Sequence, residues 1–295
     1  MFKRFGYPPG VPCWVDAMQP DPEAAVDFYG GVFGWQFEDR MPADAPGRYF
    51  VARLGGRDVA AVSSQPEAAS PAPVWNTYVW VDNAEDTAAR VKDAGGRVVT
   101  EPFDVDDAGR TAACADPSGA VFYLWQAGTH RGAEAVNEPG AWNWSDLSTR
   151  DLDGAKAFYG SVFGWETDTL DMGFGESTMV RLPGYADFLE RFDPDVRRRH
   201  AEHGAPPGFS DCIGWMQPMT RDQSADDVPS HWSVTFSVAD TDGVAATATE
   251  LGGRVLTPPF EAGPVRTAVL SDPQGGVFTV NAYKPEEPDG NSFGE

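Results

Sequence analysis

Two aspartates and one histidine are the residues in this sequence whose types suit acid–base chemistry. Asp16 lies two residues after Trp14, and Asp146 lies two residues after Trp144, at a constant offset of 130 residues. A buried carboxylate is costly unless it is paired. Each aspartate is therefore either hydrogen-bonded to backbone or to a tryptophan N–H as part of the structure, or positioned as a base or as an acceptor for a ligand. His231 opens a predicted strand and is the third candidate, with simple solvent exposure as the alternative.

The remaining nucleophilic and metal-binding residue types show no convincing pattern. His200 and His203 are three residues apart in a basic run, which favours a solvated helix face over a metal site. The three cysteines have no metal-type spacing, so free thiols in a reducing cytoplasm are expected. Serine has no nucleophile-elbow context, and no glycine-rich phosphate loop is present.

Internal repeats place the two aspartates in equivalent halves of a duplicated chain. The run DFYGGVFGW at 27–35 returns as AFYGSVFGW at 157–165. Two shorter runs also return, 95–100 as 252–257 and 115–119 as 271–275. Such repeats indicate a duplicated domain.

Composition limits the partners of the chain. Its 295 residues suit about two domains. A formal net charge of −23 repels nucleic acid and anionic lipid, which excludes both as partners. No run suggests a signal peptide or a membrane span. We therefore expect a cytoplasmic monomer or homodimer that binds a small molecule.

Each half reads as two units of one strand, one helix and three strands. In the first unit, Asp21-Pro22 begins a helix, because Asp can cap and Pro suits the first turn, and Gly34 ends it. The predicted organisation is a first domain at 1–126, a linker at 127–141, a second domain at 142–284 with an insertion at about 184–209, and a disordered tail at 285–295.

These motifs resemble the vicinal oxygen chelate superfamily, which includes glyoxalase I, extradiol dioxygenases and bleomycin-resistance proteins. The resemblance rests on the FYG-x-VFGW run and on the GG-x-V and DP-x-G-x-x-F runs, duplicated in the same order. It is closest to actinobacterial tandem members labelled "hydroxylase". It implies an α+β fold of four βαβββ units, forming two tandem domains that each curve a mixed sheet around a cavity. The fold alone does not specify the chemistry.

The resemblance also implies where a metal would bind in each half. The implied ligand positions carry Trp14, Asn76 and Tyr123 in the first half, and Trp144, Ser233 and Thr279 in the second. A divalent metal needs several imidazole or carboxylate ligands that converge on one point. We therefore predict no bound metal and no cofactor.

The same positions indicate which side chains face each cavity, because side chains alternate across a strand. For the first half they are Trp14, Asp16, Asn76, Tyr78, Trp80, Val121, Tyr123 and Trp125; for the second they are Trp144, Asp146, His231, Ser233, Thr235, Thr279 and Asn281. Aliphatic residues of the opposite parity suit packing under helices. If the strands adjoin as the resemblance implies, Asp146 and His231 could form an acid–base pair.

Two functions follow from these cavities. The first is metal-free binding of a planar aromatic or polycyclic compound, of the drug-sequestering type, with Trp14, Trp80 and Trp125 as walls. The second is an enzyme that uses Asp16 or Asp146, with His231, in an isomerase, hydratase, lyase or hydroxylase-type step. A metal-dependent glyoxalase or dioxygenase ranks third. A filled interior around Trp14, without a ligand, is the alternative to the first.

Overall fold

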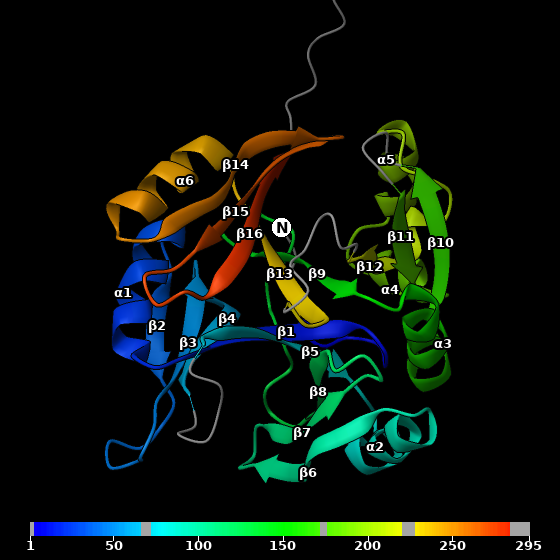
Figure 1. Ribbon diagram of the computed structural model, residues 1–295, viewed down its shortest axis with the longest axis horizontal. Helices are drawn as coiled ribbons and strands as arrows, with labels where there is room; N and C mark the ends of the chain where they lie inside the picture. Colours follow the sequence, from blue (N-terminus) through cyan, green and yellow to red (C-terminus); the bar gives the residue numbers. More distant parts are fainter. Residues whose placement is uncertain (1–2, 66–71, 172–175, 220–227, 284–295) are drawn as a thin grey trace, which may run out of the picture.

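The computed structural model describes residues 3–65, 72–171, 176–219 and 228–283, and within these ranges the chain forms two eight-stranded mixed sheets. In Figure 1 the first sheet runs from β2 and β3 on the left to β6 and β7 at the bottom, and the second runs from β10 and β11 on the right to β14 at the top. The expected α+β architecture of two tandem sheets is confirmed. The predicted tail at 285–295 lies outside the described residues.

The first sheet has the strand order β2-β3-β4-β1-β5-β8-β7-β6. Strands β1 and β4 pair in parallel, as do β5 and β8, and the antiparallel β1–β5 pair joins the two units. The strands are β1 (Pro12–Gln19), β2 (Gln36–Asp39), β3 (Tyr49–Leu54), β4 (Arg57–Ser64), β5 (Val74–Trp80), β6 (Arg97–Val105), β7 (Gly109–Ala115) and β8 (Val121–Ala127).

The second sheet repeats this topology in the order β10-β11-β12-β9-β13-β16-β15-β14. Its central β9–β13 pair is antiparallel, and it is flanked by the parallel pairs β9–β12 and β13–β16. The strands are β9 (Trp142–Thr149), β10 (Glu166–Asp171), β11 (Glu176–Arg181), β12 (Cys212–Pro218), β13 (His231–Ser237), β14 (Arg254–Ala262), β15 (Val265–Ser271) and β16 (Val277–Tyr283).

Helices follow the capping signals of the sequence. The Asp21 side chain accepts a hydrogen bond from the Ala24 amide at the start of α1, and Gly34 ends the helix with φ of 71°. The repeat gives α3 the same caps at Asp151 and Gly164. The helices are α1 (Pro22–Phe33), α2 (Ala84–Asp93), α3 (Leu152–Phe163), α4 (Tyr185–Leu189), α5 (Val196–Glu202), α6 (Thr241–Glu250) and the 3₁₀ helix η1 (Phe209–Asp211). No helix among the described residues is long and apolar enough to cross a membrane.

The two halves pack through their helices and through the repeated FGW tryptophans. Helix α1 of the first half lies beside α6 of the second, and α2 lies beside α3 (Figure 1). Trp35 Nε1 donates to Gly140 O at 2.6 Å, and Trp165 Nε1 donates to Gly10 O at 2.7 Å. Each tryptophan therefore holds the segment that leads into the first strand of the other half.

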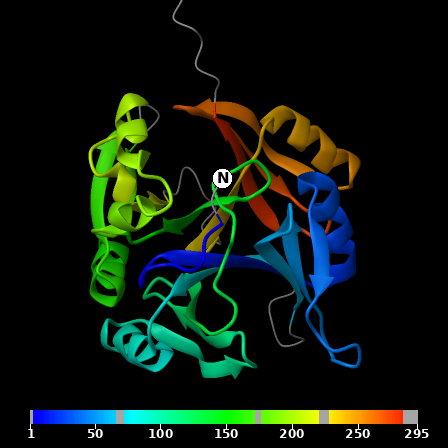
Figure 2. The same cartoon turned by 180° about the vertical axis from the view of Figure 1, so that it is seen from behind.

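The segment between the halves packs on the first sheet instead of hanging free as a simple linker. Figure 2 shows it crossing in front of the first half. Ala133 N donates to Cys13 O at 2.8 Å, and Glu134 N donates to Asp58 O at 2.7 Å. Gly132 has φ of 80°, and a Cβ there would lie 2.5 Å from Cys13 O, so only glycine allows this approach.

Candidate functional site

Each sheet has one face toward the helices and one face away from them, which we call its inner face. On the opposite side, the Phe122 ring lies 5.6 Å from that of Tyr159 on α3, and the Phe278 ring lies 5.6 Å from that of Tyr29 on α1. Phe122 and Phe278, which have this parity, therefore pack against helices of the other half, while α2 and α6 also pack on the outer strands of their own sheets. The inner faces carry Asp16 and Asp146.

The inner face of the first sheet surrounds Asp16 with hydrogen-bond donors. Asp16 Oδ1 accepts from Asn76 Nδ2 at 2.8 Å, and Oδ2 accepts from Tyr78 Oη at 2.8 Å and from Tyr49 Oη at 3.4 Å. Tyr49 Oη accepts in turn from Trp14 Nε1 at 3.0 Å. Burial raises the pKa of Asp16 to about 6, and the bonds from Asn76, Tyr78 and Tyr49 oppose the rise.

Aromatic side chains close over this network. The Trp14 ring is 2% exposed and lies edge-on to the His130 ring, with 4.4 Å between centroids. His130 also lies 5.6 Å from the Trp125 ring, and burial lowers its pKa. The sequence alone placed His130 in the linker, but the packed linker carries it onto the inner face. The arrangement is that of a filled interior, the alternative to a ligand pocket around Trp14.

Three further predicted pocket residues of the first half lie in this filled interior or at its edge. The Tyr123 ring lies 4.7 Å from that of Tyr78, tilted by 31°. Trp80 is half-buried beside the N-terminal arm, where its ring lies 6.3 Å from that of Tyr7. Val121 is 42% exposed at the start of β8. None of these rings stands free to receive a ligand as sequence analysis expected.

The register of the second sheet shows what replaces these groups. Asp16 pairs with Asn76 and Trp14 with Tyr78, whereas Asp146 pairs with Ser233 and Trp144 with Thr235. The pairings of the neighbouring strands show in the same way which residues of the two sheets are equivalent. At four inner-face positions an aromatic ring of the first sheet is replaced by a small or polar side chain of the second: Tyr49 by Ser177, Tyr78 by Thr235, Tyr123 by Thr279, and Trp125 by Asn281.

Asp146 lacks the donors that satisfy Asp16. Among the described residues, the only side chain that donates to the Asp146 carboxylate is Thr235, from Oγ1 to Oδ2 at 3.5 Å. Oδ1 is buried and has no hydrogen-bond partner within the described part of the chain. Burial raises the pKa of Asp146 to about 7, against smaller opposing effects of the Trp215 amide and the Thr235 hydroxyl. A buried unpaired carboxylate oxygen is costly unless another group supplies a donor.

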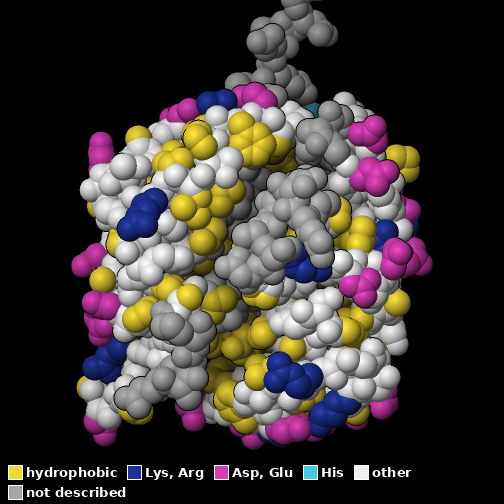
Figure 3. All heavy atoms as spheres, viewed as in Figure 1, with side chains coloured by type: hydrophobic (Ala, Val, Ile, Leu, Met, Phe, Trp, Pro, Cys, Tyr) yellow, Lys and Arg dark blue, Asp and Glu magenta, His cyan; other side chains and the backbone are white. Residues whose placement is uncertain are grey.

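Asp146 has Trp215 and the polar Ser233 as neighbours in the sheet register, and Trp144 lies two residues before it on the same strand. Trp144 and Trp215 are both half-buried, and Trp215 occupies the register position that Ala61 holds in the first sheet. The Phe209 ring of the insertion lies 6.1 Å from the Trp144 ring. Ser233 and Thr279 are half-buried, and Asn281 accepts from Asn143 Nδ2 at 3.0 Å. The space-filling view is hollowed beside β14 to β16, with hydrophobic side chains along the hollow (Figure 3).

The proposed pairing of Asp146 with His231 is wrong. The strands do adjoin, but His231 lies opposite Ser148, two residues beyond Asp146. The His231 ring is exposed, and its Nδ1 lies 2.9 Å from Pro229 O. Because His231 begins β13, its side chain reaches the end of the sheet, where solvent and the neighbouring carbonyl satisfy it.

The inner-face residues do not fit a divalent metal. In the described ranges, no group of three or more His, Cys, Asp and Glu side chains could hold a metal ion. Trp144, Ser233 and Thr279 stand at the positions that the family resemblance assigns to ligands, and they offer an indole and two neutral hydroxyls. Asp146 is a single carboxylate. Divalent metals bind several imidazole or carboxylate groups, so this donor set does not match.

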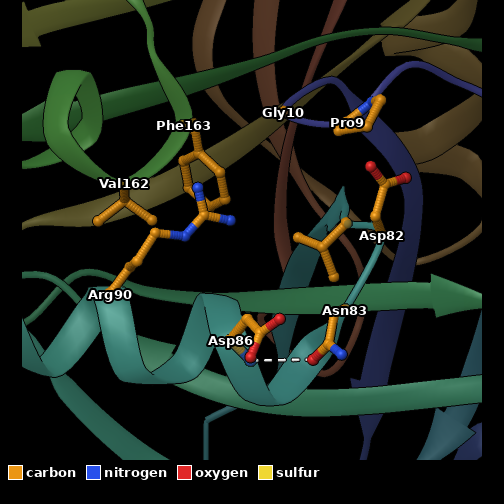
Figure 4. A pocket seen from close by; sticks show the side chains of 9 residues that line it. Pro9, Gly10, Asp82, Asn83, Asp86, Arg90, Val162 and Phe163 are labelled. Carbon is orange, nitrogen blue, oxygen red and sulfur yellow. Dashed lines mark hydrogen bonds between the residues drawn. The ribbon is translucent and has the colours of Figure 1, made fainter.

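Two cavities lie away from the inner faces. One of about 240 Å³ lies between α2 and α3, where the Arg90 side chain reaches Phe163 and Asp82 lies beside Pro9 (Figure 4). The other, of about 430 Å³, lies between the N-terminal arm and α4 and is lined by Tyr7, Phe188 and Arg191. Neither contains a residue that the sequence singled out as a site.

Sequence reasoning missed the partners that distinguish the two aspartates. Tyr49 lies on β3, from which sequence analysis took no site residue, and His130 lies in the segment that was predicted to be a linker. Their role depends on tertiary contacts, for which the local pattern gave no signal. The halves could nevertheless have been aligned strand by strand, which would have shown Thr235 and Thr279 in place of two tyrosines.

Comparisons with known proteins agree with this architecture. The glyoxalase/bleomycin resistance protein/dioxygenase superfamily matches residues 14–124, and a glyoxalase-like domain matches residues 131–281. A Mycobacterium tuberculosis protein named "Putative glyoxylase CFP32" is 37% identical over 290 residues, covering 97% of this chain and 100% of that protein. The anthracycline biosynthesis protein DnrV of Streptomyces peucetius is 32% identical over 288 residues, covering 93% and 94%. The crystal structure of the Mn(II)-bound glyoxalase from Novosphingobium aromaticivorans has a TM-score of 0.57 at 16% identity, covering 92% of this chain and 82% of that one.

Proposed function

The chain belongs to the glyoxalase/bleomycin resistance protein/dioxygenase superfamily, and on that premise we propose that it binds a planar polycyclic small molecule, without a metal, on the inner face of its second sheet. Sequence analysis favoured the first half for this role. The observation that carries the proposal is the difference between Asp16, which has three side-chain donors, and Asp146, whose Oδ1 has none among the described residues.

The second half has more room for a ligand on its inner face, because two tyrosine rings of the first half are replaced there by threonine. Thr235 and Thr279 stand where Tyr78 and Tyr123 stack in the first half. Trp144 is half-buried, whereas Trp14 is 2% exposed. A concave site with aromatic walls and a few polar groups is typical for small molecules.

The relatives support a polycyclic ligand class. Two relatives at 32% identity are named as anthracycline biosynthesis proteins. The half-buried Trp144 and Trp215 offer flat surfaces that would stack on an extended ring system. One relative is named as a glyoxylase, but we do not propose metal chemistry for this chain, because the side chains around Asp146 do not match a metal site.

A direct test uses hydroxypyrene, a planar polycyclic compound whose fluorescence reports its surroundings. Titration into the wild-type chain should give saturable binding, and removing divalent metal with a chelator should leave the affinity unchanged. The variant Trp144→Leu should weaken binding by about tenfold, since it removes one stacking wall. Absence of saturable binding, or its loss with the chelator, would contradict the proposal.

Proton transfer to or from a bound compound is a second candidate function. It is favoured by one observation: Asp146 has a free buried oxygen and a pKa raised to about 7, which suits a general acid or base near neutral pH. Incubation with hydroxylated polycyclic compounds, followed by chromatography, should reveal a product that Asp146→Asn does not form. Unchanged compounds would leave binding as the function.

A further inference from the structure

The rings of Tyr78 and Tyr123 fill part of the inner face of the first sheet, and threonine stands at both positions in the second. Resting on the proposed function, we propose that the ligand of the second half is a phenol whose aromatic hydroxyl donates a hydrogen bond to Asp146. Its ring would occupy the space that Tyr78 and Tyr123 fill on the equivalent face of the first sheet.

The position of the hydroxyl follows from the register. Tyr78 lies opposite Trp14 and donates its hydroxyl to Asp16 Oδ2 at 2.8 Å. Thr235 lies opposite Trp144 in the same way. Threonine is too short to reach the carboxylate as a phenol does, and its hydroxyl stays 3.5 Å from Asp146 Oδ2. The short hydrogen bond that tyrosine supplies in one half is therefore replaced by a long, weak one in the other.

The other carboxylate oxygen of Asp146, Oδ1, has no counterpart of the donor that Asn76 supplies to Asp16. Asn76 Nδ2 donates to Asp16 Oδ1 at 2.8 Å. Its counterpart Ser233 donates to the backbone carbonyl of Asp146 instead, at 3.2 Å. Asp146 Oδ1 is left buried and without a partner in the described residues. The ligand therefore meets a carboxylate oxygen ready to accept from it.

The ring of the ligand has a template as well. Tyr78 and Tyr123 stack with 4.7 Å between their centroids, and both are threonine in the second half. The neighbouring position gains an indole, because Trp215 replaces Ala61. A flat aromatic ring would fit beside Thr235 and Thr279 and could stack on Trp215. A hydroxyl on that ring could donate to Asp146 Oδ1, which has no partner among the described residues.

The wild-type chain separates this proposal from the broader one. Hydroxypyrene and methoxypyrene share the ring system, but only the first donates a hydrogen bond. We expect hydroxypyrene to bind at least tenfold more tightly, because a hydrogen bond donated to a buried carboxylate oxygen is stronger than one between neutral groups. Equal affinities would overturn the phenol proposal while leaving polycyclic binding intact. Failure of both to bind would overturn both proposals.

Two variants make the test specific to Asp146. In Asp146→Asn the preference for hydroxypyrene over methoxypyrene should fall to about threefold or less, because the charged acceptor is lost. Thr235→Tyr copies the first half and should place a phenol in the site, so hydroxypyrene binding should be lost while the far-ultraviolet circular dichroism stays unchanged. A folded Thr235→Tyr variant that binds hydroxypyrene as the wild type does would contradict the proposal. If that variant does not fold, the wild-type comparison and Asp146→Asn decide.

Discussion

Tyr29 Oη donates a 2.8 Å hydrogen bond to Asp272 Oδ2, across the boundary between the two halves of the chain. Tyr159, the equivalent residue of the second half, donates to Asp116 Oδ2 at 3.2 Å. Asp272 also accepts from Gln19 Nε2 at 2.6 Å and from the amides of Gln274 and Gly276. The repeated FYG and DP-x-G motifs therefore fasten each half to the other, and they contribute no group to the candidate site.

We predict that Tyr29→Phe destabilises the whole chain. The ring stays in place, but Asp272 Oδ2 loses one of its two side-chain donors, and the indole N–H of Trp75, which donates to Tyr29 Oη at 3.0 Å, loses its acceptor. The expected loss in unfolding free energy is about 1–3 kcal/mol. Thermal denaturation measures it, with Tyr283→Phe as the matched control, since Tyr283 is 60% exposed. Equal melting temperatures for the two variants would show that the bond contributes nothing.

We predict that Trp14→Ala acts on stability. The side chain is 2% exposed, contacts His130 and donates to Tyr49 Oη, so its removal leaves a cavity and an unmade hydrogen bond. Large-to-small changes of this kind cost about 3–5 kcal/mol. Chemical denaturation measures the loss. A variant as stable as the wild type would mean that Trp14 faces open space, as an unfilled pocket requires.

The fold was predictable because its signals are local. Caps at Asp21 and Gly34, the glycine turns and the alternation along β1 and β9 each depend on neighbouring residues only. The two tandem sheets followed from the repeat and from the family resemblance.

The candidate site was less predictable, because it depends on contacts distant in sequence. Parity correctly placed Trp14 and Asp16 on one face, but it could not show that His130 and Tyr49 fill the space above them. Similarly, the adjacency of β9 and β13 was expected, but the register that moves His231 away from Asp146 is set by the full pairing of the strands.

We predict that Asp146 makes the chain less stable as pH rises. Burial raises the pKa of its carboxyl from 3.8 to about 7 in the folded state, so the folded chain binds more protons than the unfolded chain between those values. Stability therefore falls as pH rises through this window. Asp146→Asn should remove the contribution of Asp146 to the fall, leaving that of Asp16, and should be more stable at about pH 8 by roughly 1–3 kcal/mol, allowing for screening at a half-buried group. Unfolding curves at several pH values check this, and parallel profiles for variant and wild type would contradict it.

We predict that the insertion at about 184–209 affects ligand binding, because one of its aromatic rings lies beside Trp144. Phe209 lies 6.1 Å from Trp144, and its ring also contacts His200. Phe209→Ala should weaken hydroxypyrene binding by about threefold to tenfold, because one aromatic neighbour of the site is lost. Phe188→Ala on α4 is the control, since Phe188 lines the separate cavity beside Tyr7. Equal effects of the two substitutions would assign the insertion a general structural role.

The location of the ligand site is tested most directly by titrating hydroxypyrene into two matched variants, Trp14→Leu and Trp144→Leu, by calorimetry. Both replace the same residue at the same position of the repeat, one in each half. Binding on the inner face of the second sheet predicts an affinity about tenfold weaker for Trp144→Leu and within about twofold of the wild type for Trp14→Leu. The reverse result, with affinity lost in a folded Trp14→Leu and kept in Trp144→Leu, would place the site in the first half and contradict the account.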